Sequence, residues 1–202
     1  MPTRRSFLLT ATAAVSLALA ACQSTPPRVS TQPIGFTQFG PIVLNAAAID
    51  VVDNHRPMGG GGKHVEQSAP TPPAEAVRRW TAERLQTNGR PGRVRVTIRD
   101  AAIIETQLPK TGGVQGYFTN DQAQRYDGRL EVEVSGESSS PDGSSFRGVT
   151  KSTVTASATV AENVSLADRE ATLQELTRRM ADQLNARLDA GIRKDLAPMV
   201  VR

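Results

Sequence analysis

The 202-residue sequence is poor in cysteine, histidine and aromatic side chains. It contains one cysteine and two histidines, and only 4% of its residues are aromatic. A single cysteine excludes a disulfide within the chain, and so few aromatic residues predict a core built from aliphatic side chains. The basic excess is also small, because the formal net charge of +4 falls to +2 once Arg4 and Arg5 are set aside. A charge so close to neutral gives no reason to expect a nucleic-acid partner.

The N-terminus is organised like a bacterial export signal. Arg4 and Arg5 are followed by an uncharged apolar segment that is too short to span a membrane. The segment ends in Leu19-Ala20-Ala21-Cys22, which resembles the lipobox of bacterial lipoproteins. The resemblance implies a signal peptide at residues 1–21 and a lipid anchor, such as palmitate, on Cys22. The alternative, an ordinary signal with an incidental cysteine, leaves a lone thiol without a partner.

Two further features of the N-terminus bear on export and sorting. Residues 3–8 resemble the twin-arginine signal, whose substrates cross the membrane folded, although paired arginines also occur in general secretory signals. Gln23 follows the cysteine, at the position where inner-membrane lipoproteins of enterobacteria carry an aspartate. We therefore expect a periplasm-facing protein, anchored in the outer membrane in preference to the inner one.

Composition divides the rest of the chain into a tether and one domain. Residues 22–41 are rich in proline, serine, threonine and glutamine, which is typical of a linker. Residues 42–202 contain the periodic segments and are numerous enough for a single domain. Within them, residues 53–73 hold four consecutive glycines and predict a mobile loop. His55 and His64 flank these glycines, but the spacing does not pre-organise a metal site, so we expect no metal and no other cofactor.

The periodic segments predict four strands. Residues 42–52 form a β-branched, mostly uncharged run that is typical of a buried strand. Alternating apolar and charged residues predict three more strands, over residues 93–105, 124–136 and 146–160. The alternation blurs around Asp100, as it would at a β-bulge.

Two amphipathic helices complete the prediction. Residues 74–86 carry Trp80 on an apolar stripe, which indicates a core position rather than a ligand platform. Ser165 begins a helix of about 30 residues with a capping box, and Leu184 lies in the middle of its apolar stripe. The order β-α-β-β-β-α predicts an α+β fold, with an antiparallel sheet of about four strands and two helices on one face.

No pattern in the sequence predicts catalysis. The two histidines are not accompanied by a nucleophile motif, and Gly112-Gly113 lacks the lysine of a phosphate-binding loop. Glu131 and Glu133 share one strand face with basic residues, where cross-strand ion pairs are ordinary. We therefore expect that the protein is not an enzyme.

The order of the elements, together with RVRVTIRDAAIIE, RLEVEV and the closing helix, resembles the YajG-type small lipoproteins. It is similar more widely to auxiliary lipoproteins of envelope transport and assembly. The resemblance covers residues 42–196. It implies no catalytic residues and an accessory, non-enzymatic role in an envelope protein complex. The alternative is a module that binds lipid or peptidoglycan.

The candidate contact with a partner lies in the connection at residues 109–123. Tyr117 and Phe118 are adjacent there, and neighbouring side chains on an extended segment point in opposite directions. One ring is therefore expected to be exposed, and exposed aromatic residues often carry binding energy. The alternative is that both rings cover an open end of the core.

Overall fold

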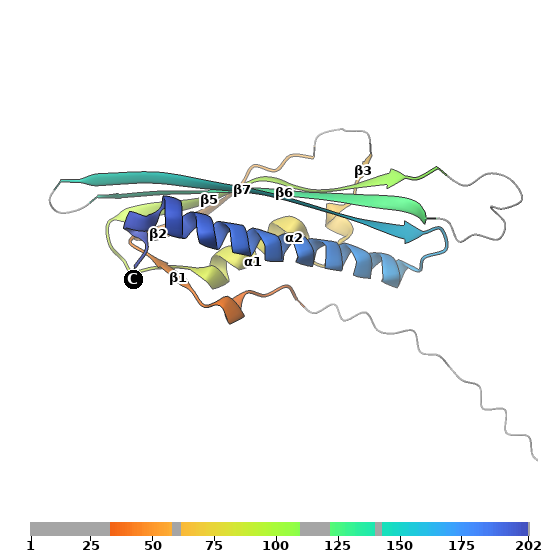
Figure 1. Ribbon diagram of the computed structural model, residues 1–202, viewed down its shortest axis with the longest axis horizontal. Helices are drawn as coiled ribbons and strands as arrows, with labels where there is room; N and C mark the ends of the chain where they lie inside the picture. Colours follow the sequence, from red (N-terminus) through yellow and green to blue (C-terminus); the bar gives the residue numbers. More distant parts are fainter. Residues whose placement is uncertain (1–32, 58–61, 110–121, 140–142, 202) are drawn as a thin grey trace, which may run out of the picture.

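A computed structural model describes residues 33–57, 62–109, 122–139 and 143–201. Two α-helices cover one face of a long sheet, which confirms the α+β class (Figure 1). In chain order the elements are η1 (Thr37–Phe39), β1 (Ile42–Leu44), β2 (Ala48–Asp53), β3 (Lys63–His64), η2 (Glu66–Ser68), α1 (Pro73–Arg84), β4 (Leu85–Thr87), β5 (Gly92–Gln107), β6 (Gln122–Ser139), β7 (Ser145–Ala161), α2 (Leu166–Asp195) and η4 (Ala197–Met199).

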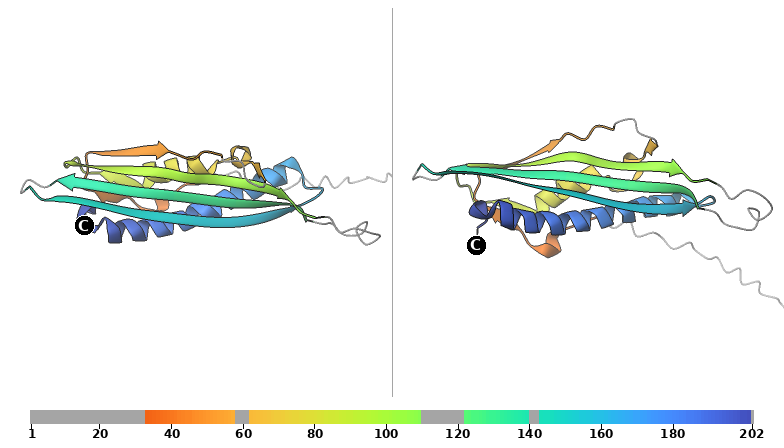
Figure 2. Two further views of the ribbon diagram at one scale, coloured as in Figure 1. Left: turned by 90° about the horizontal axis from the view of Figure 1, so that it is seen from above. Right: turned by 45° about the horizontal axis from the view of Figure 1, so that its top comes forward.

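The main sheet has the strand order β2-β5-β6-β7, with β3 beside β5 (Figure 2). The strands β5, β6 and β7 form the antiparallel meander that the alternation predicted. However, β2 pairs with β5 in parallel, so the sheet is mixed rather than purely antiparallel. The physical reason is the long connection through α1, which returns the chain to the end of the sheet where β2 began.

Residues 42–52, which we predicted as one strand, contain two strands that belong to different sheets. A tight turn at Ala46, whose N–H donates to the Leu44 carbonyl at 2.9 Å, separates β1 from β2. The strand β1 pairs in parallel with β4, which follows α1 where we expected the last helical residues. The C-terminal chain also reaches this small sheet, because Val201 donates its N–H to the Val43 carbonyl at 2.9 Å.

A β-bulge in β5 decides which of its side chains face the helices. The register with β6 shifts between Ile98 and Asp100, which leaves Arg99 as an extra residue. Ile98 is buried before the shift, and Ala101 and Ile103 are buried after it. Without the extra residue, the alternation would turn Asp100 toward the core. The bulge therefore accounts for the blurred pattern in the sequence and keeps two charged residues on the solvent side.

The core lies between the sheet and the helices. Trp80 is 0% exposed and Leu184 is 1% exposed, which confirms both as core residues. The indole N–H of Trp80 donates to Asn185 at 3.0 Å, so its one polar atom is satisfied. The predicted start of the closing helix is also confirmed, because the Ser165 side chain accepts the Asp168 N–H at 3.1 Å.

The chain that precedes β1 packs against the helices. Ile34 and Phe36 are buried, although they fall within residues 22–41, which we assigned to the tether. The Phe36 N–H donates to the Glu83 carboxylate at 2.5 Å. The buried guanidinium of Arg84 holds the next turn, with bonds to the Phe39 carbonyl at 2.8 Å, to Asn185 at 3.0 Å and to Asp189. Among the helices described, none is both long enough and apolar enough to cross a membrane.

Candidate functional site

The export, lipidation and partner-contact residues predicted from the sequence lie outside the described part of the chain. This holds for the signal and lipidation residues Arg4, Arg5, Leu19, Ala20, Ala21 and Cys22, and for the candidate contact pair Tyr117 and Phe118. Acylation of the cysteine and the contact role of the two rings therefore remain predictions. The described residues bring together a different set of functional groups, on and beside the sheet.

The face of the sheet opposite the helices carries ion pairs between neighbouring strands. We call this surface the outer face. Glu133 on β6 accepts from Arg99 at 2.7 Å and lies 3.1 Å from Lys151. Burial raises the pKa of Glu133, but the hydrogen bonds and charges of these two cations outweigh that effect and lower it. Arg129 pairs with Glu131 at 2.6 Å. The predicted cross-strand pairing is thus confirmed for Glu133, whereas Glu131 pairs with Arg129 of its own strand.

Hollows open along the outer face. A groove of about 630 Å³ combines apolar Ala102 and Ile104 with the charged groups of Arg125, Arg129, Asp100 and Asp127. A smaller hollow, of about 150 Å³, lies toward the β6–β7 turn and is lined by Arg93, Arg95, Ser135, Gly136, Glu137 and Arg147. Two arginines and two aspartates balance each other around the groove, whereas three arginines and one glutamate line the smaller hollow. Such surfaces are suited to polar contact with a partner or an anionic ligand.

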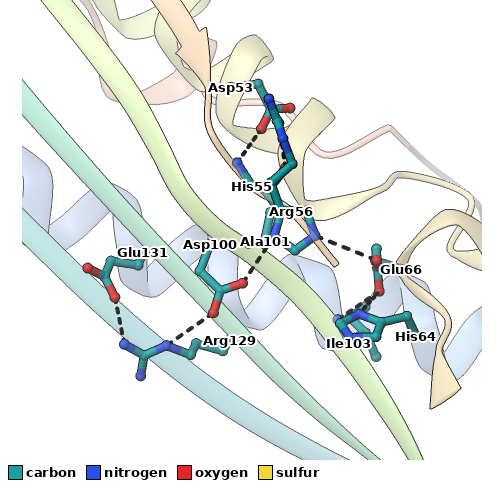
Figure 3. A network of polar contacts seen from close by, with 10 residues as sticks. All are labelled: Asp53, His55, Arg56, His64, Glu66, Asp100, Ala101, Ile103, Arg129 and Glu131. Carbon is teal, nitrogen blue, oxygen red and sulfur yellow. Dashed lines mark hydrogen bonds and ion pairs between the residues drawn. The ribbon is translucent and has the colours of Figure 1, made fainter. Parts of the chain in front are cut away.

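A buried carboxylate joins the two histidines that flank the glycine-rich loop. His64 Nδ1 lies 3.3 Å from Glu66 Oε2, and His55 Nε2 lies 3.6 Å from Glu66 Oε1 (Figure 3). The Glu66 side chain is only 5% exposed and accepts the Ile103 N–H at 3.3 Å. Burial raises the pKa of Glu66, but the backbone N–H groups of Glu66 and Ile103 and the two histidines outweigh it and lower that pKa.

His55 connects this carboxylate to the outer face. The Ala101 N–H donates to His55 Nδ1 at 3.2 Å, and Asp100 Oδ1 lies 3.2 Å from the same nitrogen. Asp100 in turn lies 3.2 Å from Arg129, so the network runs from η2 across β5 to β6 (Figure 3). The Nε2 atom of His55 is buried and makes no hydrogen bond within the described residues. The network ties the end of β2 and the chain around β3 to the bulge of β5.

The sequence did not predict that both histidines contact the same carboxylate, that of Glu66. The four glycines between them suggested that nothing pre-organises the pair, but the flanks are held independently. Pairing of β3 with β5 positions His64, and the Ala101 N–H positions His55. The only feature of the sequence that could have indicated the role of Glu66 is its position two residues after His64. In the described part of the chain, no group of three histidine, cysteine, aspartate or glutamate side chains is arranged to hold a metal ion.

A family model described as LptE, lipopolysaccharide-assembly, matches residues 63–188. This range is more than half of the chain and runs from β3 into α2. The chain belongs to the LptE family. The LptE match confirms the expected class, an envelope lipoprotein family, and attaches it to lipopolysaccharide assembly. The comparisons do not single out the YajG-type group.

No curated protein matches the sequence. Among solved structures, the chain is similar to a minor lipoprotein from Acinetobacter baumannii, with 12% identity, a TM-score of 0.34, and coverage of 79% of this chain and 98% of that one. It is also similar to the rare lipoprotein B from Shewanella oneidensis, with 10% identity, a TM-score of 0.30, and coverage of 71% and 94%. Membership of the LptE family rests on the family match and not on these distant likenesses.

Proposed function

We propose that this chain is a lipid-anchored, non-enzymatic accessory protein of lipopolysaccharide assembly at the outer membrane. The observation that carries the proposal is the LptE family match over residues 63–188. The LptE family works with an envelope complex that includes LptD, so we propose that complex as the partner. The signal at residues 1–21 would be removed, and acylated Cys22 would anchor the domain through the segment that follows it.

The polar outer face supports an accessory role. Glu133 of β6 pairs with Arg99 of β5 and Lys151 of β7, so this carboxylate is engaged in holding three strands together. The buried Glu66 is likewise occupied by backbone N–H groups and the two histidines. A sheet with a charged surface and a well-packed core is suited to binding another protein in a fixed orientation.

Depletion of the chain from its own cells tests this function. Newly made lipopolysaccharide at the cell surface should fall on depletion and recover when the wild-type chain is supplied. The Cys22→Ser variant should restore it poorly, because the domain would no longer be held at the membrane. Undiminished surface lipopolysaccharide after complete depletion would contradict the proposed function.

The groove on the outer face favours a second candidate, direct binding of a lipid. Ala102 and Ile104 offer an apolar floor that suits an acyl chain. Arg125 and Arg129 at its side pair with Asp127 and Asp100, so an anionic head would have to replace these carboxylates. The test is binding of purified lipopolysaccharide to the wild type and to Ile104→Asp, which adds a carboxylate to the floor. Equal affinity for both proteins would remove the groove as the lipid site. Peptidoglycan fragments serve as the comparison ligand.

A further inference from the structure

One edge of the main sheet is formed by β7, a strand of 17 residues. Along the described chain, β6 pairs with one side of β7 and no strand pairs with the other. A free edge leaves every second backbone N–H and C=O without a strand partner, and proteins usually protect such edges with proline, bulges or charges. The strand has no proline, and Arg147 and Lys151 are its only charged residues. It is therefore long and weakly protected by its own side chains.

Two arginines of α2 occupy carbonyl groups on this edge. Arg179 donates to the Ser157 carbonyl at 3.2 Å, and Arg187 donates to the Thr153 carbonyl at 2.5 Å. The spacings match, because eight helical residues rise about 12 Å and four strand residues span about 13 Å. Both views in Figure 2 show α2 running close beside β7. The helix thus covers the edge at two points and leaves the backbone between them uncovered.

The two guanidinium groups have no carboxylate partner within the described residues, and their bonds to the strand are the interactions that they make. Helical periodicity groups them with other exposed residues on one flank of α2. That flank includes Arg179, Gln183, Ala186, Arg187, Ala190 and Lys194, and the exposed acids of α2 nearest to Arg179 in the sequence are Glu175 and Asp182. The strand β7 contains no acid. Along the described chain, the free edge is therefore bordered by two guanidinium groups that bond to backbone carbonyls instead of carboxylates.

We propose that the β7 edge binds an extended strand of a second polypeptide that carries acidic residues four positions apart. Arg179 and Arg187 close the edge until such a strand arrives. Backbone N–H groups of the incoming strand would take over the carbonyls of Thr153 and Ser157, and the released guanidinium groups would pair with its carboxylates. Side chains four apart on a strand share a face and lie about 13 Å apart, which matches the two arginines.

Charge favours this partner over a second copy of the chain. Two β7 edges brought together would gather four arginines, two from each α2, with no carboxylate on either strand. Like charges at such a junction oppose association. Binding of an acidic strand would instead form two ion pairs with Arg179 and Arg187, and its backbone N–H groups would replace the arginines at the carbonyls of Thr153 and Ser157. The proposal does not depend on the proposed role in lipopolysaccharide assembly.

A pair of synthetic peptides tests the proposal. One is an 11-residue peptide of alternating threonine and valine with glutamate at positions 4 and 8, and the other has glutamine at both positions. Binding of each to the purified full chain is measured by fluorescence anisotropy. We expect the wild type to prefer the glutamate peptide by about three- to tenfold, which corresponds to two exposed ion pairs. The combined change Arg179→Gln and Arg187→Gln should abolish the preference.

Arg193→Gln is the matched control, because Arg193 is an exposed arginine of the same helix that pairs with Asp189 instead of β7. It should retain the preference. The proposal is overturned if the wild type binds neither peptide, binds both equally, or if the double variant still discriminates. Self-association of the double variant in the absence of peptide would assign the edge to a second copy and would also overturn it.

Hydrogen exchange gives an independent readout that needs no variant. The N–H groups of Thr153, Thr155 and Ser157 should point to the free edge, because the carbonyls of the first and last do so. Addition of the glutamate peptide to the wild type should slow exchange at these three amides. Peptide binding without added protection there would contradict the proposed surface, even if the double variant failed to fold.

Discussion

The buried side chain of Arg84 offers a sharp test of how the N-terminal chain is attached to the helices. Its guanidinium group bonds to the Phe39 carbonyl, to Asn185 and to Asp189, and only 2% of the side chain is exposed. The substitution Arg84→Met keeps most of the apolar stem and removes every donor. It therefore isolates the contribution of the buried charge.

The expected loss of stability follows from the surroundings of Arg84. Removal of one partner from a buried ion pair costs about 3–5 kcal/mol. The lower end applies, because Asp189 is 27% exposed and keeps its bond to Arg193 at 2.6 Å. Asn185 likewise keeps the Trp80 N–H. We expect the free energy of unfolding to fall by about 3 kcal/mol, which lowers the Tm by about 6–12 °C in a chain of this size.

Thermal unfolding followed by circular dichroism measures this effect. The control is Arg193→Met, which removes the exposed partner of the same Asp189 and should cost less than about 1 kcal/mol. Cleavage by a protease near Phe39 should become faster in Arg84→Met and not in the control. Equal melting temperatures for the two variants would refute the idea that Arg84 clamps the N-terminal segment.

Three further predictions concern the core, the buried carboxylate and the anchor. Leu184→Ala should lower the free energy of unfolding by about 2–5 kcal/mol, since Leu184 is 1% exposed, and an unchanged urea midpoint would contradict its core position. Folding lowers the pKa of Glu66, so its ionised form stabilises the fold at neutral pH, and this contribution is lost as the pH falls below about 4.3 and through the folded value. The stability difference between wild type and Glu66→Gln should therefore be larger at pH 7 than at pH 3, and an equal difference would exclude the ionised carboxylate as the cause. Cys22→Ser should move the protein from the membrane to the soluble fraction, and a variant that still sediments with membranes at the acylated mass would refute the lipobox.

Local patterns in the sequence were sufficient for the elements whose periodicity is strong. The alternation in β5, β6 and β7 and the stripe around Leu184 come from burial on one face, which is recorded residue by residue. Even the bulge left a trace, because the extra Arg99 inverts the alternation. No local pattern indicates that β2 pairs with β5 in parallel, because this pairing depends on where the chain returns to the sheet after α1.

The site was harder to predict, because it depends on contacts between residues far apart in the sequence. A lipobox is a contiguous motif, so Cys22 could be named from the sequence. The contact of His55 and His64 with Glu66 depends on two separate attachments to β5, which no local spacing encodes. Arg179 and Arg187 read as ordinary solvent-facing residues of an amphipathic helix. Only the register between α2 and β7 reveals that both reach backbone carbonyls.

Recovery of LptD with this chain from intact cells tests the central claim most directly. The affinity-tagged chain is cross-linked in living cells, extracted in mild detergent and purified, with an equally abundant, unrelated outer-membrane lipoprotein as the control. The LptE assignment predicts that LptD is enriched with this chain and not with the control. Absence of that enrichment, with the chain folded and anchored in the membrane, would contradict a role in lipopolysaccharide assembly.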